Sequence, residues 1–350
     1  SIKNTIGIAL QEGFNKWAKA GLTAFLSYEY RNFALTDTTN IPGQRIINNY
    51  KESSLSIGGE LSKKQGKLLH YNILGELAIA GEDAGQFSVE GRGDLNLRLF
   101  GDTVRLDVNA FIKNQNPVFY FRHFQSKHYW WDNNDLSKIM RTRLEGKLSL
   151  NRWGTQLRAG VENIKNYTYL ANASIPVKDS EGNVTGFKNN AAVRQYSGNI
   201  QIFTAMLQQK LKVGIFHLDG EVAYQKSSEQ DILPLPELSA YGNLYMKFGL
   251  AKKVLQIEMG ADVRYFSKYY APDYSPVIGQ FYNQNPDDKI EIGAFPIVNV
   301  YANLHLKRTR FFIMMYHVNA GSGKSNYFLA PHYPINPRMI KFGLSWNFFD

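Results

Sequence analysis

Apolar and polar residues alternate along much of this chain. Over residues 87–99 every odd position is apolar or glycine and every even position is polar or charged. After Gly101-Asp102 the alternation runs back, with apolar residues at the even positions of 104–112. Because successive side chains of a strand point to opposite sides, this pattern predicts a β-hairpin with one apolar and one charged face.

The same alternation returns along the rest of the sequence, and weaker cases bring the expected number to about fifteen strands. The clear cases are residues 1–10, 141–150, 157–162, 255–264, 298–307 and 340–348. The longest uninterrupted apolar run, Phe311 to Tyr316, is far shorter than the about 20 residues that a membrane-spanning helix needs. A barrel strand crosses with only about 9 to 11 residues, of which every second one is apolar.

The connections between the expected strands alternate in length. Longer, irregular loops separate the hairpins and carry many carboxylates, whereas short turns lie near 13–19, 63–67, 101–102, 152–154, 212–214, 251–253 and 307–309. Outer-membrane barrels have short periplasmic turns and long extracellular loops. The pattern therefore predicts an all-β fold, a transmembrane antiparallel up-and-down barrel with a periplasmic C-terminus. We expect a single domain over residues 1–350 with about 14–18 strands, 16 as the best value.

Composition agrees with this expectation. Aromatic residues make up 14% of the chain, as expected of a barrel with aromatic rings at the membrane interfaces. The mean hydropathy of −0.34 is compatible with barrel strands, because only every second residue of such a strand is apolar. The chain has no cysteine, which suits passage through the periplasm. The net charge is +10, but the bases lie in short turns or alternate with carboxylates instead of forming one basic face. We therefore expect no nucleic-acid partner.

The polar face of the strands carries the candidate functional residues. So many charges would be costly in a dry core, so we expect them to line a water-filled lumen. Mixed signs predict a transverse field and ion pairs between neighbouring strands, and the excess of bases predicts a mild preference for anions. The alternative is that they only solvate and brace the wall. The expected lumen-lining residues are Arg92, Asp94, Arg98, Arg105, Asp107, Arg141, Arg143, Glu145, Lys147, Arg158, Glu162, Glu258, Asp262 and Arg264.

The densest aromatic cluster lies between two expected strands. It contains Phe119, Tyr120, Phe121, Tyr129, Trp130 and Trp131. These rings could form a constriction inside the pore or a surface for a partner or a sugar. Anchoring at the outer headgroup level is the alternative that we favour from the sequence.

Enzymatic chemistry has little support. The seven histidines show no metal-ligand spacing, and His123 with His128 reads as aromatic-rich surface. The stretch Gly321-Ser322-Gly323-Lys324 lacks the context of a phosphate-binding loop. Ser126 with His128 or Asp132 gives no specific catalytic pattern. We predict no catalytic residue, no metal and no cofactor.

Four stretches resemble one known family: NTIGIALQEGFNKWAKAGLTAF from Asn4, LAKKVLQIEMGADVRYFSKYYAPDYSPVIGQFYNQ from Leu250, PIVNVYANLHLKRTRFFIMMYHVNAG from Pro296 and NYFLAPHYPINPRMIKFGLSWNFFD from Asn326. They are similar to the putative-porin family of Bacteroidota outer membranes. The resemblance implies a single β-barrel and passive transport, with no site residue to carry over. Members are longer at the N-terminus, so the chain resembles their C-terminal half or more. Bacterial barrels normally have an even number of strands, so the expected count of about fifteen agrees with one or more strands that precede Ser1.

The end of the chain resembles the alternating C-terminal signal by which outer-membrane barrels are recognised for assembly. Phe342, Leu344, Trp346 and Phe348 carry it, although Asp350 stands in place of the usual terminal aromatic.

The function expected from these observations is a porin-like channel of the outer membrane for passive diffusion of small hydrophilic solutes. The alternative is a structural barrel that anchors partners or forms a subunit of a larger envelope complex. An enzyme at the barrel rim ranks well behind both. Expected partners are outer-membrane lipid and lipopolysaccharide, small hydrophilic solutes, and other outer-membrane proteins or lipoproteins.

Overall fold

A computed structural model describes residues 1–15, 19–38, 45–99, 101–126, 128–323 and 326–348. Within these residues one antiparallel sheet of fifteen strands accounts for most of the chain. Strands of this sheet that follow one another along the chain are hydrogen-bonded neighbours. Its strands, in order, are β1 (Ile2–Leu10), β2 (Gly21–Thr38), β3 (Arg45–Lys63), β4 (Leu69–Gly81), β5 (Phe87–Leu99), β6 (Asp102–Gln115), β9 (Ile139–Leu150), β10 (Thr155–Asn172), β13 (Ala191–Val213), β14 (Phe216–Ser227), β15 (Leu238–Leu250), β16 (Leu255–Phe266), β19 (Ile297–Leu306), β20 (Thr309–Tyr316) and β23 (Met339–Trp346).

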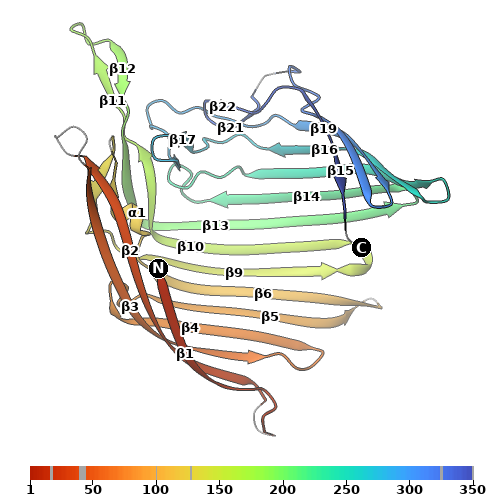
Figure 1. Cartoon of the computed structure of the whole chain (residues 1–350), viewed down its shortest axis with the longest axis horizontal. Helices are drawn as coiled ribbons and strands as arrows, with labels where there is room; N and C mark the ends of the chain where they lie inside the picture. The colour runs from red at the N-terminus through yellow and green to blue at the C-terminus, as the bar shows by residue number, and fades with distance from the viewer. Residues whose placement is uncertain (16–18, 39–44, 100, 127, 324–325, 349–350) are drawn as a thin grey trace.

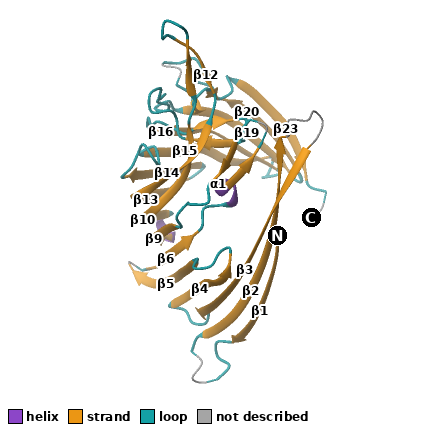
Figure 2. Cartoon of the chain, turned by 90° about the vertical axis from the view of Figure 1, so that its left-hand side faces the viewer, coloured by secondary structure: helices purple, strands orange, loops and turns teal. Residues whose placement is uncertain are grey.

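The sheet curls around an interior, and the order of its strands is that of an up-and-down barrel (Figures 1 and 2). The all-β barrel class predicted from the alternation is thereby confirmed. In the described part of the chain β1 hydrogen-bonds only to β2, and β23 only to β20. The sheet thus has an odd number of described strands, and the expected additional strand stays a prediction.

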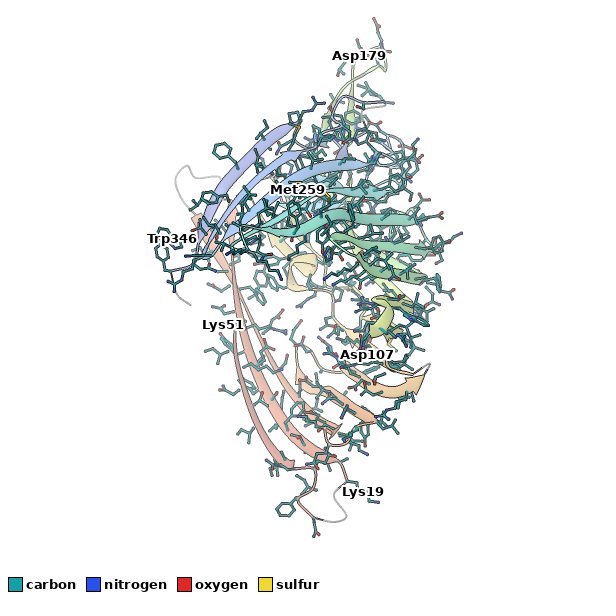
Figure 3. The ribbon with its side chains drawn as sticks, turned by 90° about the vertical axis from the view of Figure 1, so that its right-hand side faces the viewer. Lys19, Lys51, Asp107, Asp179, Met259 and Trp346 are labelled. Atoms are coloured by element: carbon teal, nitrogen blue, oxygen red, sulfur yellow. The ribbon has the colours of Figure 1, made fainter. Side chains whose placement is uncertain are left out.

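The connections separate into two ends of the molecule. Short turns join the strands at one end, on the right of Figure 1, and longer connections lie at the other. Figure 3 shows Asp179, in the connection between β10 and β13, and Lys19, in the first short turn, at opposite extremes of the molecule. The short turns need left-handed backbone. Gly154 has φ +63°, and a Cβ there would lie 2.3 Å from the carbonyl oxygen of Lys210, so only glycine fits this turn.

The longer connections carry the remaining regular elements, which are short. They are the helix α1 (Phe119–Arg122) and the hairpins β7 (His123–Gln125) with β8 (Trp130–Asp132), β11 (Ile175–Lys178) with β12 (Val184–Lys188), β17 (Asp273–Ser275) with β18 (Gln280–Tyr282), and β21 (Phe328–Ala330) with β22 (Tyr333–Pro334). A 3-10 turn, Asn151–Trp153, joins β9 to β10. No helix among the described residues has the length and apolar character to cross a membrane.

Burial is inverted relative to a water-soluble protein. Leu144 and Val161, on the apolar face of β9 and β10, are 54% and 53% exposed, whereas Glu52 and Asp262, on the polar face, are 6% and 7% exposed. Cross-strand register keeps each face uniform, because Leu144 is opposite Val161 and Arg143 is opposite Glu162. The apolar face is therefore the outside of the curled sheet, and the charged face lines its interior.

Two small apolar clusters lie among the longer connections. One is made of Tyr129, Trp131, Leu170 and Ala191, and the other of Phe295, Ile297 and Ile335. Both bury side chains of loops against the ends of strands. Packed loops therefore cover the interior at this end of the molecule.

Substituting arginine on the two faces of one strand tests this facing. Val222 lies at the middle of β14 on the outer face and is 44% exposed. If this face contacts hydrocarbon, Val222→Arg will lower the free energy of unfolding by about 2–4 kcal/mol. Gln225→Arg, on the inner face of the same strand, is the matched control and should cost less than about 1 kcal/mol. Reversible urea unfolding of the protein in lipid vesicles measures the free energy of unfolding of both variants. An equal loss of stability in the two would contradict the assignment of faces.

Candidate functional site: the charged inner wall and the inner loop

Ion pairs join neighbouring strands along the inner wall of β4, β5, β6 and β9. Asp94 and Asp107 are directly opposite each other in the register of β5 and β6, an arrangement of like charges that needs cations nearby. Arg105 supplies one, with Nε 2.8 Å from Asp107 Oδ1 and Nη2 3.7 Å from Asp94 Oδ1. His70 Nδ1 lies 3.0 Å from Asp94, and Lys147 Nζ lies 3.0 Å from Asp107. The five side chains form one alternating ladder.

A second ladder follows on β9 and β10. Glu162 is contacted by Arg141 and, at 3.9 Å, by Arg143, which also bonds Glu145. Arg158 Nε lies 3.9 Å from the other oxygen of Glu145. On β5 and β6, Lys113 pairs with Glu90 at 2.6 Å. The predicted ion pairing between neighbouring strands is thus present on this wall.

A different composition characterises the inner wall of β15, β16 and β19. Asn299 Nδ2 donates to Asp262 Oδ1 at 2.9 Å in a buried contact, and the Tyr301 hydroxyl donates to Asn243 at 3.1 Å. The Arg264 guanidinium lies 5.7 Å from the centre of the Tyr241 ring. Tyrosine and asparagine here take the place of most bases of the β5–β10 wall, although Arg264 remains and Lys247 pairs with Glu258 at 3.5 Å. The interior therefore has a base-rich wall and a wall of tyrosines, amides and carboxylates.

The structure places all the sequence-predicted wall residues on the inner, polar face. These are Arg92, Asp94, Arg98, Arg105, Asp107, Arg141, Arg143, Glu145, Lys147, Arg158, Glu162, Glu258, Asp262 and Arg264. The ladders bring most of them together in pairs, whereas Arg264 contacts a ring and Arg92 points into a cavity.

A segment between β6 and β9, of which residues 117–126 and 128–133 are described, folds into the interior, and we call it the inner loop. Its helix α1 lies inside the curve of the sheet (Figure 2). Phe119 stacks on Phe33 of β2 with ring centres 3.7 Å apart, and it meets Tyr50 of β3 edge-on at 5.4 Å. Both partners belong to the inner face of the wall. The loop is therefore fixed to β2 and β3 by aromatic contacts.

Charges fix the same end of the inner loop. Arg122 donates from Nη2 to Glu52 at 2.7 Å and from Nη1 to Glu82 at 2.7 Å. Glu52 also meets Arg31 Nε at 3.1 Å, and Arg31 Nη2 bonds Asp83 at 2.6 Å. Glu52 thus joins the loop to the wall through two guanidinium groups in a shielded setting, where such contacts are stronger than at a free surface.

The other end of the inner loop packs against β10 and β13. Trp131 stacks on Phe124 at 4.6 Å and belongs to the buried cluster with Leu170 and Ala191. Its indole Nε1 donates to the carbonyl oxygen of Tyr120 at 2.9 Å. The loop therefore spans the interior from the wall of β2 and β3 to the wall of β10.

The six aromatic residues singled out from the sequence divide by exposure. Phe119, Tyr129 and Trp131 are buried and hold the loop, and Phe121 packs against the same cluster. Tyr120 and Trp130 are 54% and 62% exposed. The sequence favoured headgroup anchoring for the cluster, but the contacts of Phe119 and Trp131 are with the inner wall.

Serine and histidine in this loop have separate partners in the described structure. Ser126 Oγ hydrogen-bonds to the main chain of Tyr129, and His123 Nδ1 lies 2.6 Å from Asp132. The described residues contain no group of three or more His, Cys, Asp or Glu positioned to hold a metal ion.

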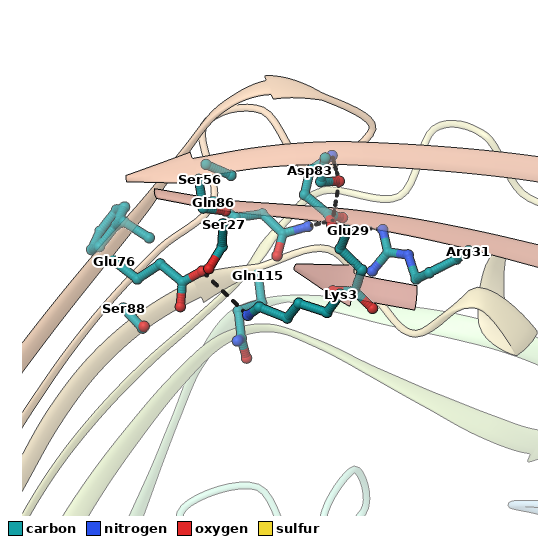
Figure 4. A pocket seen from close by; sticks show the side chains of 13 residues that line it. Lys3, Ser27, Glu29, Arg31, Ser56, Glu76, Asp83, Gln86, Ser88 and Gln115 are labelled. Carbon is teal, nitrogen blue, oxygen red and sulfur yellow. Dashed lines mark hydrogen bonds and ion pairs between the residues drawn. The ribbon is translucent and has the colours of Figure 1, made fainter. Parts of the chain in front are cut away.

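A polar cavity of about 230 Å³ lies beside the anchored end of the loop, on the inner face of β1 to β5 (Figure 4). Arg31 and Asp83 border it, and Lys3 of β1 reaches Glu76 of β4 at 3.6 Å. Sequence reasoning missed these residues, as it missed Glu52. The alternation in β2 and β3 could have placed them on the polar face, but their mutual contacts join positions far apart in the chain.

The connections after β16 and β20 pack on each other above the interior. His317 is fully buried and lies 5.0 Å from the ring of Tyr327, and His332 Nδ1 lies 3.3 Å from Asp273. Burial raises the pKa of the Tyr269 hydroxyl in this region. The aromatic stretches of both connections are thus parts of one packed cover. Lys324, Phe349 and Asp350 lie outside the described residues.

The solved structures that match this fold include receptors and a transporter. A mutant of the ferric enterobactin receptor PfeA of Pseudomonas aeruginosa matches with a TM-score of 0.62 and 14% identity, over 98% of this chain and 53% of that chain. The siderophore receptor PirA of Pseudomonas aeruginosa gives 0.57 and 10%, and the copper transporter OprC gives 0.56 and 11%. Both matches cover 98% of this chain. They cover 55% of the PirA chain and 57% of the OprC chain. The chain therefore spans about half the length of these proteins.

These similarities and the inverted burial define the class: the protein is an outer-membrane β-barrel. A family model described as "Putative porin" matches residues 1–350. The chain belongs to this family, as its sequence motifs predicted. No curated protein matches the sequence.

The contact between Arg122 and Glu52 can be tested by loosening the loop. Arg122→Ala leaves Glu52 with Arg31 alone and removes the bond to Glu82, so the amides of residues 119–132 should exchange with solvent at least about tenfold faster. Arg122→Lys should have a smaller effect because lysine keeps the charge without the two-armed geometry. Hydrogen exchange followed by mass spectrometry measures this. Unchanged exchange in Arg122→Ala would show that the aromatic contacts alone hold the loop.

Proposed function

We propose that the protein is a channel of the outer membrane through which small hydrophilic solutes diffuse passively. One observation carries the proposal: a face rich in ionised side chains lines the interior of a sheet whose other face is apolar and exposed. Arg105 and Arg141, both in ion pairs, keep 50% and 45% of their side-chain surface accessible. Ions that remain accessible in this way favour a wet interior over a dry core.

The lengths of the connections support an orientation in the membrane. Barrels of this class have short turns on the periplasmic side and longer loops outside the cell. The turn between β9 and β10 and the end of β23 would then face the periplasm. The inner loop and the packed cover would lie on the extracellular side, where they would restrict entry. We assign the protein no catalytic role, and lipid and lipopolysaccharide would surround its outer face.

The inner loop also favours a second candidate. A segment that spans the interior and is held by aromatic and charged contacts could close the barrel, which would then act as a structural or partner-anchoring subunit of the envelope. The exposed rings of Tyr120 and Trp130 would offer such a partner an aromatic surface. The two functions differ in whether the purified barrel conducts ions.

Conductance in planar lipid bilayers distinguishes the two functions. The purified protein should give stable open-channel steps, and liposomes that contain it should swell in isotonic solutions of small sugars. Denatured protein in the same detergent is the control for leakage. Silent bilayers together with absence of swelling would reject the passive channel and favour the anchoring role.

Removal of the inner loop tests whether it restricts flow. Replacing residues 119–132 by a short glycine-serine linker should raise single-channel conductance by roughly twofold, because a segment that narrows the pore controls its resistance. A matched replacement of residues 179–183, at the tip of the hairpin β11–β12, should leave conductance unchanged. Equal conductance of all three proteins would show that the narrowest point lies elsewhere.

A further inference from the structure

A cavity of about 390 Å³ lies on the base-rich wall, toward the end of the short turns. Strands β3 to β6 and β9 contribute to it, and its charged lining includes Lys64, Arg92, Arg105 and Lys147. Asp94 and Asp107 are the carboxylates in this lining. Bases therefore outnumber acids around the space.

The carboxylates of this cavity already have partners. Asp107 meets Arg105 with one oxygen and Lys147 with the other, and Asp94 meets His70 and Arg105. Arg105 and Lys147 are thus committed to the ladder. Asp94 and Asp107 therefore have cationic partners without any contribution from Arg92.

Arg92 has no ion-pair partner among the described residues. In the register of β4, β5 and β6 it stands between two neutral amides, Asn72 on one side and Asn109 on the other. The nearest acids on its own strand are Glu90, which pairs with Lys113 at 2.6 Å, and Asp94. Arg92 is exposed toward the cavity, and the exposed Lys64 lies on its rim.

A planar guanidinium presents two parallel donors, which match the two oxygens of a carboxylate or phosphate. The neighbouring Asn109 amide can donate to the same group, and Lys64 and Lys147 add positive potential. A cation lacking a protein partner in a cavity with excess positive charge is suited to an anion from solution. Neutral solutes would gain little from this arrangement.

We propose that Arg92 is the centre of an oxyanion-binding site in this cavity, which takes the carboxylate or phosphate group of small anionic solutes. The inference rests on the proposed channel function and deepens it by naming the class of solute. Binding would be weak and reversible, since conduction requires that the ion also leaves.

Block of chloride current tests the site. Inorganic phosphate and succinate, added separately to the wild-type channel in potassium chloride, should each reduce the current in a saturable way; the relative strength of block shows which oxyanion the site prefers. In Arg92→Gln the concentration for half block should rise about tenfold, the effect of losing a hydrogen bond to a charged group. Arg92→Lys, which keeps the charge, should raise it less.

Lys51→Gln is the matched control, because it removes the same charge from the outer face of β3 and should leave block unchanged. Equal block in wild type and Arg92→Gln, or no block of an open wild-type channel, would overturn the site while the channel function stands. If the bilayers stay silent, the channel function fails. Titration of phosphate into the protein in lipid nanodiscs, followed by calorimetry, then still tests the site: Arg92→Gln should weaken binding about tenfold, and equal binding would overturn the site.

Discussion

Pairing of the main-chain amides is the constraint on which the structure depends. In hydrocarbon no water can satisfy a peptide group, so a chain without apolar helices must pair its strands with one another. Pairing in turn fixes the alternation of side chains, and a shift by one residue would move every charge to the lipid face. The register places Arg143 opposite Glu162 and Leu144 opposite Val161. It is thus fixed by the different surroundings of the two faces, hydrocarbon on the outside and a polar interior on the inside.

The interior meets a second constraint, because ions on the inner face need partners or water. The ladder through Asp94, Arg105, Asp107 and Lys147 satisfies the carboxylates with cations from neighbouring strands. Such a ladder also stiffens the wall, since Asp94, Arg105 and Asp107 are each held from two sides. In the proposed channel, charges left over after this pairing, such as Arg92, are the ones that would be available to solutes.

The sequence predicted the strands and their faces well because both follow from a local rule of period two. Residues 87–99 were predicted as a strand, and β5 spans Phe87–Leu99. The short turns were equally readable, since lysine and glycine pairs interrupt the alternation. The inner loop was less readable. Its density of rings marked it as unusual, but ring density does not indicate whether a loop packs inward or toward lipid headgroups.

The contacts that decide the position of the loop join residues remote in sequence. Arg122 meets Glu52, 70 residues away, and Phe119 meets Phe33. Neither pair has a periodic signature, because each depends on how far the sheet curls and which strands it brings opposite the end of β6. A loop held at both ends by such contacts does not move independently of the strands that it contacts. Its opening would require breaking the charged and the aromatic contacts together, so a fixed narrowing of the interior is favoured over a freely moving gate.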